Sequence, residues 1–186
     1  MRMIEPCCYS KQLEGLIDRC AETKGAGHFF SYSDWTLADL LGTLAKYCGG
    51  GELCLAMVRA DLPLIEAVRR TLTAKYGGKD AVGKMTLVTQ PPVSGGTVNL
   101  REEIRLQLGS FVREGRLVLC EDNIGFRCVL LRSREHSLVI QGSLNTERSG
   151  AMQMFTLTAS PEECDNVAEM FAVKERTKKS RMKSEE

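Results

Sequence analysis

Apolar residues recur along this chain with two different spacings, and each spacing predicts one kind of element. Spacings of three and four residues are typical of helices that bury one face. Short continuous apolar runs are typical of strands that are covered on both faces. The helical pattern covers residues 12–20, 33–47, 61–76, 99–113 and 160–173. The strand pattern covers residues 28–32, 53–58, 85–88, 116–121, 126–132, 138–141 and 152–158.

Polar residues that favour helix starts precede most of the predicted helices. Ser33 or Asp34 is expected to cap the second helix, and Asp61 is expected to open the third. Asn99 is expected to cap the fourth helix, and Ser160 stands at the start of the last one. These residues fix where each helix is predicted to begin.

The order of the elements predicts the class of fold. Helices alternate with buried strands over the first two-thirds of the chain, and four strands follow in close succession. We expect an α/β fold, a mixed β-sheet flanked by helices on both faces, with a β-meander and a closing helix in the last third. Residues 1–173 are predicted to form a single domain. Residues 174–186 are rich in Lys and Arg and are predicted to be a flexible tail.

Composition and charge say more about the size and location of the protein than about its function. Of the 186 residues, 43% are hydrophobic and the net charge is +1, which fits one domain with a substantial core and gives no general case for nucleic acid. No apolar run of about 18 residues occurs, so we expect no membrane partner. The first residues lack the pattern of a signal peptide, so the protein is expected to be cytoplasmic.

Eight cysteines are many for this length and permit two interpretations. A secreted disulfide framework is one. Reduced, mostly buried thiols are the other, and this interpretation is favoured because Cys54, Cys120 and Cys128 lie in apolar runs. No CxxC pair or other zinc spacing occurs, so no metal site is expected. The glycine-rich stretches lack the residues of phosphate and dinucleotide loops, so no cofactor is expected.

A recognisable motif lies between the last strands of the predicted sheet. Two apolar strands follow each other, and the second ends in Gly-Ser-x-Asn at 142–145. This order resembles the phospholipase D-like superfamily, whose motif is His-x-Lys, four residues, Asp, and later Gly-Ser-x-Asn. Phe126, Cys128 and Ser133 stand where that family has its His, Lys and Asp, and the stretch 133–142 is two residues longer than the usual pattern.

The resemblance implies a chemistry and a set of site residues. Active members transfer phosphoryl groups through a phospho-histidine, and single-copy members pair as homodimers. Without the His and the Lys, this chain resembles a catalytically degenerate member that has no catalytic residue and binds a phosphodiester ligand such as nucleic acid. Ser143, Asn145 and Gln153 are expected to bind the phosphate-type anion, and Arg59 is expected to add charge.

Two other functions are open at this point. An active phosphodiesterase or nuclease would need displaced catalytic residues, for which His136, His28 and Cys128 are the candidates. His136 lies in a polar segment that predicts a hairpin turn, and Cys128 is flanked by apolar residues that predict a buried thiol. A purely structural interaction protein is the third interpretation, which is favoured if Phe126 fills the site.

Overall fold

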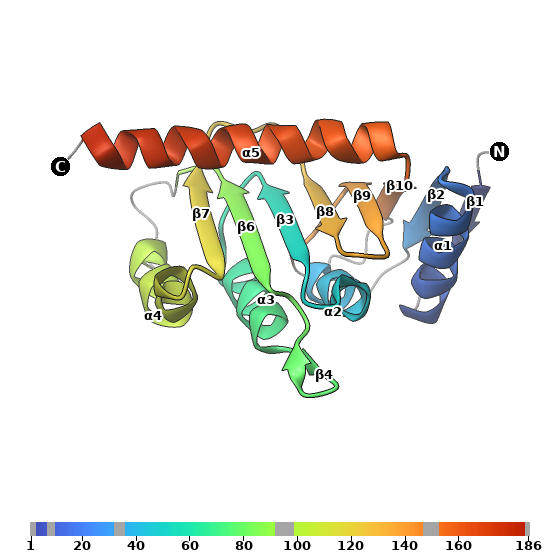
Figure 1. Ribbon diagram of the computed structural model, residues 1–186, viewed down its shortest axis with the longest axis horizontal. Coiled ribbons are helices and arrows are strands. Elements are labelled where there is room, and N and C mark those ends of the chain that lie inside the picture. The colour runs from blue at the N-terminus through green and yellow to red at the C-terminus, as the bar shows by residue number, and fades with distance from the viewer. Residues whose placement is uncertain (1–2, 7–9, 32–35, 92–98, 147–152, 185–186) are drawn as a thin grey trace.

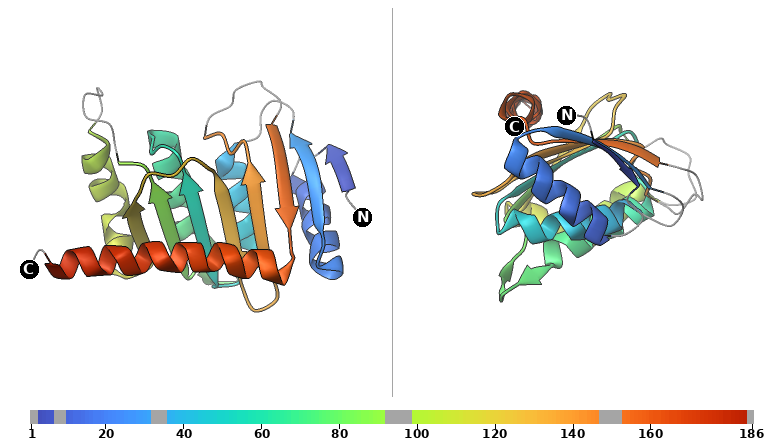
Figure 2. Two further views of the ribbon diagram at one scale, coloured as in Figure 1. Left: turned by 90° about the horizontal axis from the view of Figure 1, so that it is seen from above. Right: turned by 90° about the vertical axis from the view of Figure 1, so that its right-hand side faces the viewer.

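The computed structural model describes residues 3–6, 10–31, 36–91, 99–146 and 153–184. In this part of the chain, one large sheet lies between a group of four helices and a single long helix (Figures 1 and 2). The helices are α1 Ser10–Thr23, α2 Leu37–Cys48, α3 Leu62–Thr73, α4 Leu100–Arg113 and α5 Pro161–Ser184. The strands of the large sheet are β1 Met3–Pro6, β2 Ala26–Ser31, β3 Glu52–Met57, β6 Lys84–Thr89, β7 Leu117–Glu121, β8 Cys128–Arg132, β9 Ser137–Gly142 and β10 Gln153–Thr158.

The sheet is mixed, with strand order β1-β2-β10-β9-β8-β3-β6-β7. Strands β3, β6 and β7 are parallel, β8 is antiparallel to β3, and β9 is antiparallel to both of its neighbours, β8 and β10. The predicted α/β fold with a mixed sheet and helices on both faces is therefore confirmed. The predicted meander of four strands was wrong in one respect, because β7 pairs with β6 at the far edge. Helix α4 connects β6 to β7 as a crossover between parallel strands, which removes β7 from the meander.

Strand alternation divides the core into two layers. On β3, Leu53, Leu55 and Met57 pack against the side covered by α1 to α4, whereas Cys54 and Ala56 pack on the side of α5. Successive side chains of a strand point to opposite faces, so a strand covered on both sides needs a continuous apolar run. This explains why the central strands lack the alternating polar pattern of a half-exposed sheet.

Several boundaries differ from the prediction. Helix α2 is capped by Thr36, which forms a capping box with Asp39, so neither Ser33 nor Asp34 is its cap. The reciprocal hydrogen bonds between Thr36 and Asp39 satisfy backbone donors that an earlier start would leave open. Helix α3 ends at Thr73 rather than near residue 76.

A small hairpin follows α3 and was missed in the sequence. It consists of β4 Lys75–Tyr76 and β5 Lys79–Asp80. Gly77 and Gly78 form its turn with φ values of 59° and 79°, a conformation that glycine adopts without a steric cost. Strand β1 was missed as well, since four residues are too few to show a period.

The end of the chain also differs from the prediction in its secondary structure. Helix α5 continues through Ser184, across the predicted domain boundary at residue 173. The basic segment that begins at Lys174 is therefore a continuation of α5 as far as the structure describes it. None of the described helices is long and apolar enough to cross a membrane.

No disulfide bond joins the cysteines that the structure describes to one another. Those six thiols are all buried: Cys20, Cys48, Cys54, Cys120, Cys128 and Cys164. Cys7 and Cys8 lie outside the described residues. Four of the six lie in the layer between the sheet and α5, where they pack as small apolar groups.

Candidate functional site

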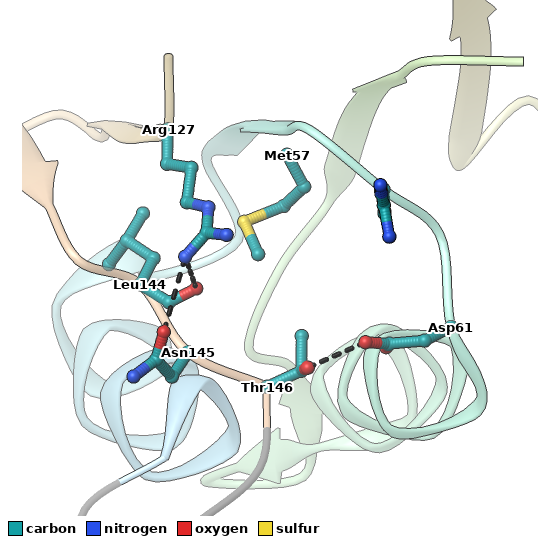
Figure 3. A pocket seen from close by; sticks show the side chains of 7 residues that line it. Met57, Asp61, Arg127, Leu144, Asn145 and Thr146 are labelled. Atoms are coloured by element: carbon teal, nitrogen blue, oxygen red, sulfur yellow. Dashed lines mark hydrogen bonds between the residues drawn. The ribbon is translucent and has the colours of Figure 1, made fainter. Parts of the chain in front are cut away.

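A pocket of about 350 Å³ lies at the carboxyl end of β3 (Figure 3). Ligands of open α/β sheets bind at the carboxyl ends of parallel strands, because the loops that follow those strands gather there. Three separate segments of the chain meet around this pocket: the loop after β3, the residue before β8 and the segment after β9. The lining residues are Met57, Arg59, Asp61, Arg127, Leu144, Asn145 and Thr146.

The Gly-Ser-x-Asn segment is held in place at Asn145. Leu37 is the first residue of α2, and its backbone amide donates a hydrogen bond to the backbone carbonyl of Asn145 at 2.9 Å. The backbone amide of Asn145 donates to Oε1 of Gln153 at 3.4 Å. The backbone of Asn145 is thus hydrogen-bonded to the start of α2 and to Gln153 of β10.

Arg127, the residue just before β8, reaches the side chain of Asn145 (Figure 3). Its Nη1 donates to Oδ1 of Asn145 at 3.2 Å and lies 3.5 Å from the carbonyl oxygen of Leu144. These contacts use one nitrogen of a guanidinium that carries five N–H groups. Arg127 is half-buried and lines the pocket, so its charge is held at the pocket wall.

The opposite wall of the pocket is connected to the start of α3 by hydrogen bonds of Asp61. Oδ1 of Asp61 accepts a hydrogen bond from the backbone amide of Leu64 at 2.8 Å and caps the helix. Oδ2 of Asp61 accepts a hydrogen bond from the hydroxyl of Thr146 at 2.6 Å (Figure 3). Both oxygens of this carboxylate are therefore engaged within the protein.

The pocket carries more positive than negative charge. Arg59 and Arg127 contribute two guanidinium groups, and Asp61 contributes one carboxylate. Arg59 is exposed and has no hydrogen-bond or ion-pair partner among the described residues. The pocket also adjoins the N-terminus of α3, where the helix dipole favours a negative charge. This arrangement suits a small anion.

The lining residues offer no nucleophile of the phospho-histidine kind. The pocket contains no His, Lys or Cys side chain. Within the described residues, no group of three or more His, Cys, Asp or Glu side chains could hold a metal ion. The hydroxyl of Thr146 is the one alcohol in the lining, and it donates to Asp61.

The structure brings together two of the four predicted ligand-binding residues. Arg59 and Asn145 line the pocket. Ser143 is exposed and does not line it, and the amide of Ser143 donates to the carbonyl of Met154 instead. Gln153 is only 2% exposed, and its Oε1 accepts a hydrogen bond from the Asn145 amide. Gln153 thus supports the pocket from behind and does not face it.

The residues around Cys128 lie on both faces of the sheet. Cys128 lies in the apolar layer on the α5 side of the sheet and is 1% exposed, and Phe126 precedes it by two residues. Arg127 stands between them and faces the pocket on the other side. Sequence reasoning missed Arg127 because it followed the positions of the motif. The alternation of β8, with Val129 and Leu131 in the layer of α1 to α4, is the signal that would have found it.

The alternative catalytic candidates lie away from the pocket. His136 ends the turn between β8 and β9, at the end of these strands that is far from the pocket. Its ring packs edge-on against the ring of Tyr47, with 5.2 Å between the ring centroids. Ser133 is in the same turn, and its hydroxyl accepts from the amide of His136 at 3.0 Å. His28 is on β2, with Nδ1 3.0 Å from the hydroxyl of Thr156.

The thiol of Cys128 is not poised for nucleophilic attack. Burial raises the pKa of Cys128 to about 12, so the reactive thiolate is scarce near neutral pH. The nearby backbone of Ala56 lowers the pKa by a smaller amount. The predicted buried thiol is confirmed.

The chain is similar to solved structures in its fold, but it matches no family model and no curated protein in its sequence. The solved structure of NucT from Helicobacter pylori is similar, with a TM-score of 0.51 and 8% identity, over 80% of this chain and 95% of that one. At this identity the likeness concerns the fold alone.

Two further solved structures are similar at lower TM-scores. The archaeal chromatin protein TrmBL2 matches with a TM-score of 0.49 and 13% identity, over 87% of this chain. This chain spans 58% of the length of that structure. Nuc from Salmonella typhimurium, described as a phospholipase D family member, matches with a TM-score of 0.45 and 10% identity, over 73% of this chain and 84% of that one.

Proposed function

We propose that this chain is a phospholipase D-like module that binds a phosphodiester anion, with the nucleic-acid backbone as the preferred class, and that it lacks the catalytic chemistry of that family. One observation carries this proposal. Arg59 and Arg127, which are far apart in the sequence, line a single pocket at the carboxyl end of β3. Guanidinium groups match phosphate oxygens in charge and in the geometry of their donors.

The contacts of the pocket indicate a weak rather than a tight anion site. The carboxylate of Asp61 offsets one of the two positive charges, although both of its oxygens accept hydrogen bonds from the protein. Arg59 is exposed, so water screens its charge. Binding of a long polyanion would therefore depend on several phosphate contacts, of which this pocket supplies one.

The lining residues support binding in preference to turnover. Phosphoryl transfer through a phospho-histidine needs a His next to the phosphorus atom. The chain has two His residues, and the structure places both outside the pocket. Neither Phe126 nor Cys128 at the motif positions replaces the missing nucleophile.

We propose two further properties of the module. The six described cysteines form no disulfide bond with one another, which is typical of a reducing compartment and supports a cytoplasmic protein. The resemblance to single-copy phospholipase D-like proteins implies a homodimer. Sedimentation of the purified chain measures the dimer directly, and a monomer across the accessible concentrations would contradict it.

The pocket is tested with two arginine variants and a matched control. Arg59→Ala and Arg127→Ala each remove one charge from the pocket, whereas Arg134→Ala removes one charge from the exposed turn between β8 and β9. We expect each pocket variant to weaken binding of a fluorescein-labelled oligonucleotide roughly fivefold or more, because a charge-assisted hydrogen bond is lost. The control should change the affinity little. Fluorescence anisotropy at low salt measures the affinities.

The same experiment separates the proposed function from its rivals. Equal losses in Arg59→Ala and Arg134→Ala would show that only the total charge matters, and the pocket would not be the binding site. Absence of binding by the wild type would favour a purely structural protein. Because Arg59 has no hydrogen-bond or ion-pair partner among the described residues, we expect its variant to change ligand binding without a change in folding.

A further inference from the structure

A second pocket, of about 530 Å³, lies beside the first at the same end of the sheet. It is lined by Val58, Gly125, Phe126, Arg127, Gln141 and Gly142. Arg127 lines both pockets. The partner of Gln141 across the sheet is Cys128, whose side chain lies on the side of α5. The second pocket is therefore on the opposite face of the sheet from the first, and Arg127 lies between them.

An aromatic ring is exposed in this second pocket. The side chain of Phe126 is 42% exposed. Elsewhere on the same face of the sheet, α5 covers a buried apolar layer. Helix α5 begins at the other end of these strands, where Sγ of Cys164 is 4.0 Å from the carbonyl oxygen of Thr158. Figure 2 shows that α5 crosses the strands near one end and leaves the rest of β8, β9 and β10 uncovered.

Glycines keep the space beside the ring open. A side chain at Gly125 would meet no atom within 4 Å, so this position faces open space. Gly142 has a φ of 149°, and a Cβ atom there would lie 2.2 Å from the carbonyl oxygen of Met154. Gly142 therefore allows β9 to approach β10 closely at the edge of this pocket. Gln141 supplies an amide that can both donate and accept hydrogen bonds.

We infer that the second pocket binds an unpaired nucleobase, which stacks on Phe126 while the neighbouring phosphate lies at Arg59 and Arg127. The ligand of the module is then a single-stranded nucleic acid. An exposed aromatic ring next to a basic groove is how sequence-tolerant proteins bind single strands. The faces of duplex bases are covered by their neighbours, so only an unpaired base can reach a ring inside a pocket. This inference rests on the proposed function, because the phosphate contacts are shared.

The experiment compares a base-bearing ligand with one that lacks bases. The probes are a fluorescein-labelled oligothymidylate and an abasic oligomer of the same length and charge. We expect the wild type to bind the oligothymidylate about tenfold more tightly than the abasic oligomer, because stacking adds to the phosphate contacts. Phe126→Ala should abolish this preference, and Phe126→Trp should retain it.

A matched control removes another exposed apolar side chain. Leu106 is exposed on α4, so Leu106→Ala tests for an unspecific effect of surface hydrophobicity and should keep the preference. Arg59→Ala should weaken both probes by the same factor. If the wild type binds both probes equally, the base pocket is disproved while the proposed anion site remains. If neither probe binds, both proposals fail.

A second copy of the chain is the competing occupant of this face, because Met154 is 55% exposed on the same side of the sheet as Phe126. Sedimentation of the wild type and of Phe126→Ala distinguishes the two occupants. We expect the substitution to leave the sedimentation coefficient unchanged. A wild-type dimer that dissociates in Phe126→Ala would assign Phe126 to an interface between copies and would overturn the nucleobase pocket.

Discussion

Arg127 and Cys128 are neighbours in sequence, yet they experience opposite environments. The guanidinium of Arg127 lines a pocket open to solvent and donates to Asn145, whereas the thiol of Cys128 is buried in the apolar layer on the other face of the sheet. This contrast follows from the alternation of side chains along a strand. A role assigned to one position of β8 therefore says nothing about the next position.

The thiol of Cys128 should be unreactive in the folded protein. Burial raises its pKa to about 12, so at pH 8 the protonated form dominates, and the folded sheet excludes reagents as well. We expect no labelling of Cys128 by N-ethylmaleimide in native buffer and complete labelling in guanidinium chloride, measured by peptide mass spectrometry. Rapid native labelling at Cys128 would contradict the buried position.

The protein should not hydrolyse phosphodiesters without a metal ion. Both of its His residues are engaged elsewhere: His28 is beside Thr156 and His136 packs against Tyr47. We expect no turnover of bis(p-nitrophenyl) phosphate in the presence of a chelator. Turnover that is lost in His136→Ala would instead support an active enzyme with a displaced catalytic residue.

At the scale of elements, α5 is attached to the sheet by polar as well as apolar contacts. Glu175 accepts hydrogen bonds from Nζ of Lys84 at 2.8 and 3.0 Å and from the hydroxyl of Thr86 at 2.5 Å. Phe171 and Cys164 on the same helix are buried against the sheet. The polar contacts join α5 to β6, and the apolar ones cover the cysteine-rich layer.

Removal of the Glu175 charge should loosen α5. Glu175→Gln loses a charge-assisted pair that is only partly exposed, so we expect a loss of about 1–2 kcal/mol in the free energy of unfolding. Urea denaturation measures this loss. Glu169→Gln is the control on the same helix, because Glu169 pairs with Arg176 in an exposed position and should contribute little. Equal effects in the two variants would show that Glu175 has no special role.

The contribution of this pair should also depend on pH. Burial lowers the pKa of Lys84, but its hydrogen bonds to Glu175 and Glu52 raise it by more in sum, and the net shift is upward. A raised pKa stabilises the protein below the unfolded value of about 10.4, and that stability is lost as the pH rises through the folded value. The difference in stability between wild type and Glu175→Gln should therefore shrink above about pH 10.4.

At the scale of the whole molecule, the charged residues are unevenly distributed along the chain, although the net charge is only +1. Helix α5 runs past the edge strand β7 (Figures 1 and 2). The part of α5 beyond Arg176 carries a cluster of basic residues, Lys178, Lys179, Arg181 and Lys183. A polyanion bound at the end of β3 would gain affinity from such a segment only through long-range attraction or direct phosphate contacts.

Binding of a single strand should weaken steeply with salt. Each phosphate contact releases counterions, so the logarithm of the affinity should fall by about 0.7 per contact for each tenfold rise in salt. Replacement of Lys178, Lys179, Arg181 and Lys183 by Gln should flatten this slope and weaken the oligothymidylate and the abasic oligomer alike. Anisotropy titrations at several salt concentrations measure the slope. An affinity independent of salt would contradict a phosphate-based interaction.

The sequence by itself determined the kind of element at most positions. Continuous apolar runs predicted β3 and β6 because a strand covered on both faces must be apolar at every position. Asp61 and Asn99 predicted the starts of α3 and α4 because their side chains accept hydrogen bonds from the first free amides of those helices. Each of these signals depends on residues within one or two turns of each other.

Only the tertiary structure decided which residues share a site. Arg59, Arg127 and Asn145 come from three segments, and their meeting depends on the order of strands and on the register of β8 against β9. A shift of one residue in register moves every side chain of a strand to the other face, so the site depends on a strand pairing that the local sequence does not fix. Local pattern specifies the elements, whereas the pairing of distant strands specifies the pocket.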